Sequence, residues 1–282
     1  MPMVTTKEML RKAQRGKYAV GAFNIENAEM AAGVIKAAAQ LRAPVILQTT
    51  SSTLRYMPPE VYSGIVHALA ASVPIPVAMH LDHGSSEEIA LRCLDAEYSS
   101  VMIDGSMLPF EENVQTTKKV VATAHAAGIP VEAELGKVGG KEDDLTADEN
   151  VYTDPEQALD FTKRTGVDSL AVSIGTAHGF YAGTPVLDVK RLSEIRACVD
   201  IPLVLHGASG LSDDDIRDCV ARGICKVNFA TELRAAYTQG VRDALAADAG
   251  LYDPKKFGEA AMTRITALAM DRIRTCGADG KA

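Results

Sequence analysis

The chain has 282 residues, of which 47% are hydrophobic and 23% charged, and its formal net charge at pH 7 is −8. This composition supplies enough apolar surface for a large core and excludes a mainly disordered chain. The negative charge argues against nucleic acid or an anionic membrane surface as the main partner, although local donors can still bind a small anionic substrate.

The sequence predicts a cytoplasmic protein. No apolar run approaches the ~20 residues that cross a bilayer. The first residues, Met-Pro-Met-Val-Thr-Thr-Lys, lack the charged-then-apolar order of a signal peptide. The five cysteines are scattered and include no Cys-x-x-Cys pair, so we expect reduced, buried thiols.

A strand followed by a helix recurs about every 30 residues, which is the size of a βα repeat. Short apolar runs predict strands whose two faces are both buried, and prolines introduce four of them. Helical spacing of apolar residues and N-cap signals predict helices over 27–40, 212–222 and 254–275. The predicted strands are 18–23, 45–48, 77–81, 100–103, 131–134, 169–173, 203–206 and 226–229.

Eight such units without a break in composition predict an α/β fold, a (β/α)₈ TIM barrel with an additional C-terminal helix, spanning residues 1–282 as a single domain. A doubly wound sheet is the alternative. The segment 136–152 fits neither a strand nor a helix and carries two adjacent glycines, Gly139 and Gly140. A loop of this length is typical of a lid or a binding loop.

The third predicted strand ends in a carboxylate and an imidazole side by side, Asp82 and His83. Ser85 stands three residues before Glu88, the spacing of a capping box, which predicts that the next helix begins there. His80 shares a strand face with Asp82, so we expect it to point into the barrel in a structural role.

Three histidines lie at equivalent places along the chain. His83, His178 and His206 follow the third, sixth and seventh predicted strands, and each is followed directly by glycine. The carboxyl ends of barrel strands open on one face, so these imidazoles are predicted to converge. Three protein ligands and an open position are typical of catalytic zinc.

The loops after the last two strands are candidate phosphate sites. One is His206-Gly-Ala-Ser-Gly210 and the other is Asn228-Phe-Ala-Thr231, and each leads into a helix. Backbone N–H groups and helix N-termini at these places commonly bind phosphate in barrel enzymes. A phosphorylated substrate is therefore predicted.

Several motifs resemble the class II, metal-dependent ketose-bisphosphate aldolases. The resemblance runs from Gly21-Ala-Phe-Asn24 to Asp253-Pro254, and its most specific parts are Leu81-Asp-His-Gly84, Glu132-Ala-Glu-Leu-Gly-Lys-Val-Gly-Gly-Lys-Glu-Asp143, Gly175-Thr-Ala-His-Gly179 and Leu205-His-Gly-Ala-Ser-Gly210.

The resemblance implies roles for individual residues. It implies that His83, His178 and His206 bind Zn²⁺ and that Asp82 exchanges the proton of the C4 hydroxyl, while Glu142 moves the proton on the dihydroxyacetone phosphate half. Asp104 and Glu134 match ligands of a second, weaker metal, and a monovalent cation (Na⁺ or K⁺) is a further expected cofactor. The residues expected to bind substrate are Thr50, Gly179, Gly207, Ala208, Ser209, Asn228, Phe229, Ala230 and Thr231.

Departures from the family pattern bear on the substrate. Members that use fructose bisphosphate often carry Asp or Asn at the position of Ala230, so the pattern favours the tagatose-bisphosphate branch. Lys255 stands where relatives often have an arginine near the second phosphate, but a lysine lacks the bidentate fork. Fructose 1,6-bisphosphate or a related ketose phosphate remains the alternative substrate.

Other classes of function stay open at this level. Lys226 is the best candidate for a Schiff-base nucleophile, which would make zinc unnecessary. A barrel-type metal hydrolase would usually add a carboxylate ligand to the metal, and a non-catalytic barrel subunit or scaffold is possible because fold does not settle function. The resemblance and the extra helix also imply a homodimer or homotetramer.

Overall fold

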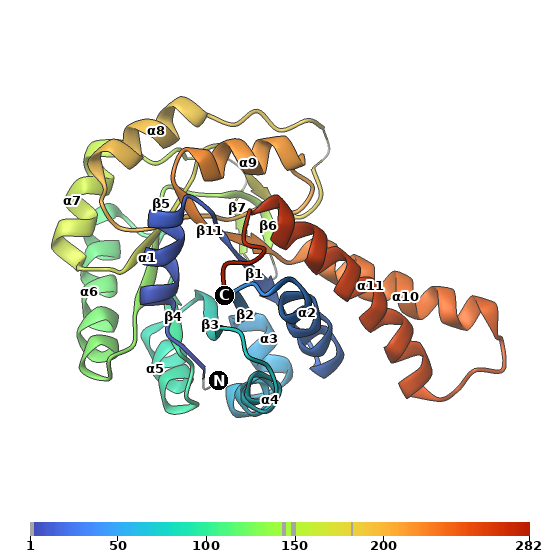
Figure 1. Cartoon of the computed structure of the whole chain (residues 1–282). Helices are drawn as coiled ribbons and strands as arrows, with labels where there is room; N and C mark the ends of the chain where they lie inside the picture. The colour runs from blue at the N-terminus through green and yellow to red at the C-terminus, as the bar shows by residue number, and fades with distance from the viewer. Residues whose placement is uncertain (1–2, 143–144, 148–150, 182) are drawn as a thin grey trace.

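The computed structural model describes residues 3–142, 145–147, 151–181 and 183–282. For residues 141, 142 and 145–147 it describes the backbone only. Eight parallel strands form a closed barrel in the order β1-β11-β10-β8-β5-β4-β3-β2 (Figure 1). The barrel closes because β1 pairs with both β2 and β11. The fold is therefore the predicted TIM barrel and not a doubly wound sheet. The barrel strands are β1 (Val20–Asn24), β2 (Val45–Thr50), β3 (Val77–Gly84), β4 (Ser100–Ile103), β5 (Val131–Leu135), β8 (Ser169–Val172), β10 (Leu203–Leu205) and β11 (Ile224–Phe229).

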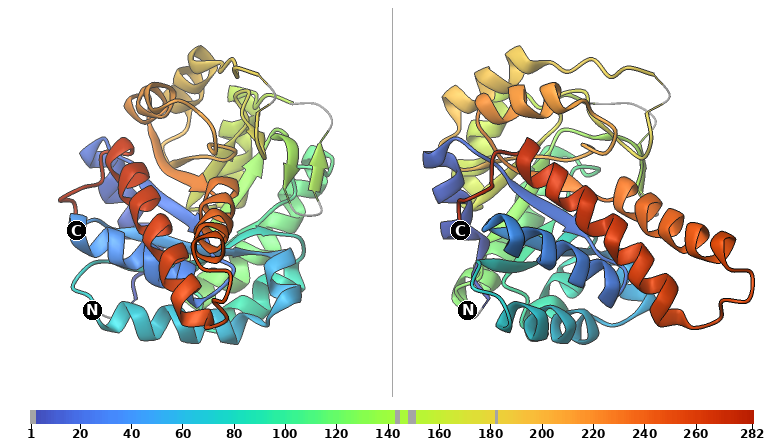
Figure 2. Two further views of the ribbon diagram at one scale, coloured as in Figure 1. Left: turned by 90° about the vertical axis from the view of Figure 1, so that its right-hand side faces the viewer. Right: turned by 45° about the vertical axis from the view of Figure 1, so that its right-hand side comes forward.

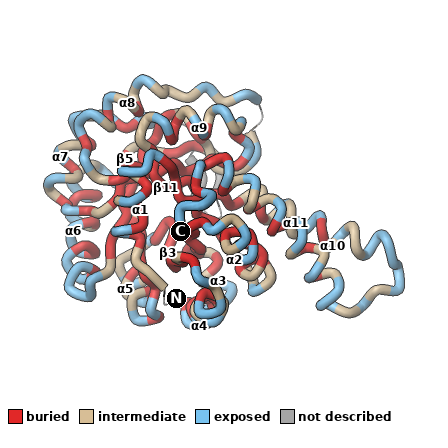
Figure 3. The backbone as a smooth tube through the Cα atoms, in the orientation of Figure 1, coloured by how far each residue is buried: buried red, intermediate tan, exposed pale blue. Residues whose placement is uncertain are grey.

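Every residue of these barrel strands is buried, as Figure 3 shows along the interior. This explains why the strands appear in the sequence as continuous apolar runs and not as alternating ones. All eight predicted strands are present, with ends displaced by at most three residues.

Most of the helices pack around the barrel. The N-terminal helix α1 lies instead at the amino ends of the strands, because Val4 N donates to Val77 O and Thr6 Oγ1 donates to Ser100 Oγ. The helices are α1 (Thr6–Gly16), α2 (Ala28–Leu41), α3 (Ser51–Tyr56), α4 (Pro59–Ala71), α5 (Glu87–Asp95), α6 (Phe110–Ala126), α7 (Pro155–Thr165), α8 (Val189–Cys198), α9 (Asp213–Ala221), α10 (Thr231–Ala247) and α11 (Pro254–Thr275).

Helix caps follow the predicted signals with one correction. Asn27 caps α2 and Ser212 caps α9, each by accepting a backbone N–H of the first turn. Helix α5 is capped by Ser86, however, and not by Ser85. Strand β3 continues to Gly84, and Ser85 N donates to Ser51 Oγ, so the helix begins one residue later than expected.

The segment 136–152 is not a loop without secondary structure. It contributes two short strands, β6 (Gly139–Glu142) and β7 (Leu145–Ala147), which pair in antiparallel orientation. Strand β6 also pairs in parallel with β9 (Ala177–His178). The pattern was missed because these strands are short and rich in glycine and charge, and the partner β9 lies more than thirty residues away in the sequence.

Helices α10 and α11 form a hairpin whose far end projects from the barrel (Figures 1 and 2). Helix α11 packs against α2, through Gly258 near Glu29 as well as Ile265 near Gly33, whereas the turn of the hairpin is exposed and carries Tyr252, 91% exposed. Among the described residues, no helix is both long and apolar enough to cross a membrane.

Candidate active site

The three predicted histidines converge at one end of the barrel. The ring centroid of His83 lies 4.5 Å from that of His206 and 5.1 Å from that of His178, and the last two are 6.2 Å apart. One ring nitrogen of each lies within 4.8 Å of the other two. Strand β3, strand β9 and the residue after β10 therefore supply one imidazole each, as their places in the sequence predict.

The backbone of β3 turns sharply to present His83. His83 has a φ of 45°, in the left-handed region that non-glycine residues seldom adopt. The pairing of β3 with β4 is irregular between Leu81 and Gly84, and a Cβ on Gly84 would lie 2.2 Å from Met102 O. The glycine after this histidine is therefore required for the close approach of two strands.

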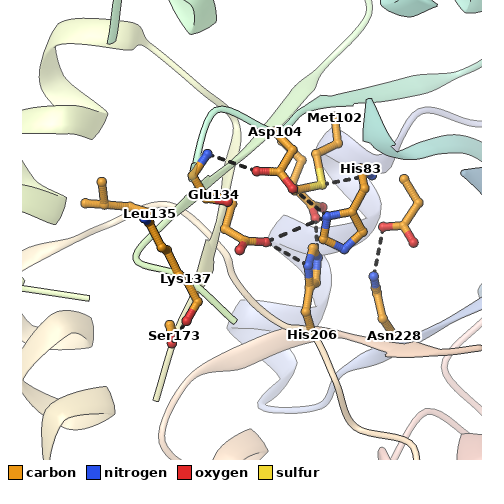
Figure 4. Close-up of polar contacts among 12 residues, drawn as sticks. His83, Met102, Asp104, Glu134, Leu135, Lys137, Ser173, His206 and Asn228 are labelled. Carbon is orange, nitrogen blue, oxygen red and sulfur yellow. Dashed lines mark hydrogen bonds and ion pairs between the residues drawn. The ribbon is translucent and has the colours of Figure 1, made fainter. Parts of the chain in front are cut away.

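Carboxylates surround the histidines (Figure 4). His83 Nδ1 lies 2.7 Å from Asp104 Oδ2, and His206 Nε2 lies 3.0 Å from Glu132 Oε1. Burial by itself raises the pKa of Asp104, but the hydrogen bonds from His83 and Ser106 outweigh burial and hold that pKa below its ordinary value. Carboxylates in such positions fix the orientation of metal-binding imidazoles.

The remaining contacts fit a divalent metal. Glu134 Oε2 lies 3.0 Å from His206 Nδ1, yet both atoms are buried without a hydrogen bond of normal geometry among the described residues. A buried nitrogen and a buried carboxylate oxygen in this state are costly unless another group satisfies them. His83, Asp104 and Glu134 form a second cluster of suitable ligand atoms, so the two residues expected at a second metal are brought to the same place.

Asp82 is fully buried beside this cluster and is held by two amides. Asn24 Nδ2 donates to one carboxylate oxygen at 2.9 Å, and Asn228 Nδ2 donates to the other at 2.9 Å. Gln48 Nε2 in turn donates to Asn24 Oδ1 at 2.8 Å. Asn24 and Gln48 were not among the residues predicted for the site; the available signal was a polar residue in a run that otherwise reads as a buried strand.

Lys226 is fully buried inside the barrel and contacts both oxygens of Glu132 at 2.9 and 3.0 Å. Burial by itself raises the pKa of Glu132, but Lys226 and the hydrogen bond from His206 hold it below its ordinary value. Lys226 therefore belongs to a buried ion pair, which argues against the Schiff-base alternative. His80 is also buried and bonds to Ser100 Oγ at 2.8 Å, as expected for a structural residue.

A small cavity adjoins the histidines. It is lined by residues of both loops predicted for phosphate, although not by His206, Gly210 or Phe229, and it shares His178 with the histidine cluster. Ser209 Oγ accepts a hydrogen bond from Ala230 N at 3.3 Å, which joins the two loops. The lining residues are His178, Gly179, Gly207, Ala208, Ser209, Asn228, Ala230 and Thr231.

The structure does not bring every predicted residue to this cavity. Phe229 is fully buried and stacks on Phe23, with ring centroids 5.4 Å apart. Thr50 is the β2 partner of Asp82, and its hydroxyl caps α3 by accepting from Thr53 N at 3.3 Å. The side chain of Glu142 lies outside the described residues.

Lys255 lies at the start of α11 on the projecting hairpin, with a side chain 86% exposed and bonded to Asp253 Oδ1 at 2.8 Å. Figures 1 and 2 show that this hairpin leads away from the barrel.

The chain resembles known proteins over nearly its whole length. The family model described as class-II fructose-bisphosphate aldolase matches residues 4–281. The crystal structure of the YdjI aldolase from Escherichia coli K12 is 36% identical, with a TM-score of 0.88 and 99% of each chain covered.

Two further solved structures agree with that match. A putative fructose-1,6-bisphosphate aldolase from Coccidioides immitis is 28% identical, with a TM-score of 0.90 over 97% of this chain and 96% of that one. A fructose-bisphosphate aldolase from Campylobacter jejuni, 22% identical, shares the fold with a TM-score of 0.85 over 100% of this chain and 97% of that one.

Proposed function

The chain belongs to the class II fructose-bisphosphate aldolase family, and we propose that it is a zinc-dependent aldolase that reversibly cleaves a ketose 1,6-bisphosphate to dihydroxyacetone phosphate and glyceraldehyde 3-phosphate. We propose tagatose 1,6-bisphosphate as the favoured substrate. The observation that carries the proposal is the convergence of three imidazoles beside a buried carboxylate and a cavity suited to phosphate.

We propose that His83, His178 and His206 hold the zinc ion. Neutral imidazole ligands leave the ion its full positive charge, and zinc supplies Lewis-acid stabilisation of the charge that develops on the carbonyl oxygen during carbon–carbon cleavage. Asp104 and Glu132 keep two of these imidazoles in orientation through hydrogen bonds of 2.7 and 3.0 Å. Asp104 and Glu134 also support a second, weaker metal position.

Asp82 is proposed to exchange the proton of the C4 hydroxyl. Each carboxylate oxygen accepts an amide N–H, from Asn24 and from Asn228, so the side chain is fixed in one orientation. A general acid or base must lie within hydrogen-bond reach of the proton that it moves, and this fixation keeps Asp82 adjacent to the imidazoles. Glu142, from the strand β6, is proposed for the proton on the dihydroxyacetone phosphate half.

The substrate phosphate is proposed to bind in the cavity lined by the loops 206–210 and 228–231. Gly179 and Gly207 line this cavity and have φ angles of 90° and 66°, a left-handed conformation that glycine adopts without strain. The N-terminus of α10 begins at Thr231 on the cavity wall, and helix N-termini favour anions. Ala230 also lines this wall. It departs from the Asp or Asn expected for fructose bisphosphate, and the proposed preference for tagatose bisphosphate rests on that departure.

The proposal is tested by measuring triose phosphate release from tagatose and fructose 1,6-bisphosphates in parallel. We expect cleavage of both, a higher kcat/KM for tagatose bisphosphate, loss of activity with a chelator and recovery with Zn²⁺. Absence of triose phosphate from both substrates would overturn the aldolase proposal and favour a scaffold. A higher kcat/KM for the fructose ester would overturn only the substrate preference, and covalent trapping by borohydride would favour Lys226.

A further inference from the structure

Tyr181 lies in the segment that follows the ligand His178, and its hydroxyl joins two parts of the site. Tyr181 Oη accepts a hydrogen bond from Ala177 N at 2.9 Å and donates one to Gly207 O at 2.7 Å. Ala177 directly precedes His178, and Gly207 directly follows His206. One side chain therefore links the backbones that carry two of the three imidazoles.

The barrel ladder does not reach these two backbones. The parallel pairing of β8 with β10 ends at Ala171 and Val204, before either histidine. Beyond that point the two segments are nevertheless in contact, because a Cβ on Gly207 would lie 2.7 Å from Ala177 O. The Tyr181 hydroxyl accepts from one segment and donates to the other. It thus takes the place of the backbone hydrogen bonds that join paired strands.

The linked segments also form other parts of the site. Gly179 and Gly207 both line the phosphate cavity. Strand β9, which contains Ala177 and His178, pairs with β6, the strand that ends at Glu142. A shift between Ala177 and Gly207 would therefore change the spacing of the imidazoles and the width of the cavity together.

We propose that the Tyr181 hydroxyl is a positioning group that sets the distance between His178 and His206 and, with it, the shape of the phosphate cavity. This inference rests on the proposed zinc-dependent function. Burial, the largest contribution, raises the pKa of Tyr181, so the phenol keeps the proton that it donates to Gly207 O at neutral pH.

The test is the variant Tyr181→Phe, which retains the ring and removes both hydrogen bonds. We expect its zinc dissociation constant, measured by competition with a chromophoric chelator, to rise about 10- to 100-fold, as is usual when a group that orients a metal ligand is lost. We also expect KM for the ketose bisphosphate to rise, while the metal-free protein keeps its circular dichroism spectrum.

The matched control is Tyr98→Phe, which also removes a buried hydroxyl contact, the one of 2.8 Å between Tyr98 Oη and Thr49 Oγ1. Neither residue of this contact adjoins a proposed zinc ligand in the sequence. We expect it to bind zinc as the wild type does. A second variant, Gly207→Ala, places a Cβ 2.7 Å from Ala177 O and so forces the two segments apart. It is expected to weaken zinc binding as well.

Three outcomes would overturn the inference alone. Wild-type zinc affinity in Tyr181→Phe would refute it, and so would an equal loss in Tyr98→Phe, because that would indicate a general effect of losing a buried hydroxyl. If Tyr181→Phe does not fold, wild-type zinc affinity in Gly207→Ala decides against it. A wild-type protein that binds no zinc and cleaves no ketose bisphosphate would instead refute the proposed function, and the inference with it.

Discussion

Asp82 and His83 are adjacent in the chain but take separate roles because the backbone turns between them. Asp82 is still in register with Thr50 of β2, and its carboxylate is directed to Asn24 and Asn228. His83 has a positive φ and faces the other two imidazoles. Asp82 is thus the proposed acid–base group, and the adjacent His83 is a proposed metal ligand.

Replacing Asp82 with alanine separates these two roles. We expect Asp82→Ala to retain zinc and to lose roughly 10²–10⁴-fold in kcat, the usual contribution of a general acid–base group. Zinc content by atomic absorption and steady-state kinetics provide the check. The control is Asp160→Ala on the surface of α7, where the carboxylate only pairs with Arg164; near-normal turnover in Asp82→Ala would contradict the assigned role.

The buried ion pair of Lys226 and Glu132 is expected to be important for stability. Lys226→Met leaves the Glu132 carboxylate in the barrel interior without its cation, and breaking a buried pair in this way costs about 3–5 kcal/mol. Urea unfolding of the metal-free protein measures the change. Lys190→Met, which removes an exposed i,i+4 pair with Glu194, is expected to cost less than about 1 kcal/mol; equal losses would rule out a special contribution from burial.

At the level of elements, Arg272 ties together the helices behind the phosphate cavity. Arg272 of α11 lies 2.9 Å from Asp213 Oδ1 of α9, 3.4 Å from Glu232 Oε1 of α10 and 3.2 Å from Asp271 Oδ2 of its own helix. Helices α9 and α10 follow the two candidate phosphate loops, 206–210 and 228–231. Arg217 also pairs with Asp213, at 3.3 Å, so two guanidinium groups face three carboxylates and an excess of negative charge remains at this junction.

This excess predicts a dependence of stability on pH. Burial, with the charges of Asp271 and Asp213, raises the pKa of Glu232 to about 7 against the opposing effect of Arg272. The folded state thus binds a proton that the unfolded state releases near its ordinary pKa, so the contribution of Glu232 to stability is present at low pH and is lost as the pH rises toward 7.

The variant Glu232→Gln removes this titration. We expect the variant to gain stability relative to wild type as the pH rises. The difference between its free energy of unfolding and that of wild type should be larger by about 1–3 kcal/mol at about pH 8 than at about pH 5. Urea unfolding at the two pH values gives the comparison, with Glu259→Gln on the exposed face of α11 as control. A difference that does not change with pH would show that Glu232 does not titrate in this range.

For the whole molecule, removal of the metal should lower thermal stability. Zinc that binds only the folded state stabilises it by about 4 kcal/mol when free zinc is ~1,000-fold above its Kd. Calorimetry with and without chelator should therefore show a lower Tm for the metal-free protein and recovery on adding Zn²⁺. An unchanged Tm would argue that the histidines bind no metal under those conditions.

The projecting hairpin is relevant to the expected homodimer or homotetramer. Its exposed turn carries Tyr252, and the exposed Lys255 lies in the first turn of α11. We expect light scattering to give two or four times the 29.9 kDa mass of the chain. A monomer would contradict this expectation.

The sequence by itself determined the repeated βα order and the three histidine-glycine positions. Buried parallel strands require continuous apolar runs, and a closed barrel places all strand ends of one kind on one face. Local signals also predicted the cap at Ser212, because a cap depends on residues within one helical turn. These features follow from local chemistry together with the regular geometry of the fold.

Only the tertiary structure decided which side chains support the site. Asn228 and Asp82 are separated by 146 residues, and Lys226 and Glu132 by 94, so no spacing in the sequence indicates these contacts. The same holds for Tyr181 and Gly207, and for the pairing of β6 with β9 that converts an expected loop into a sheet. Such contacts depend on how distant segments pack, and packing becomes defined only when the barrel closes.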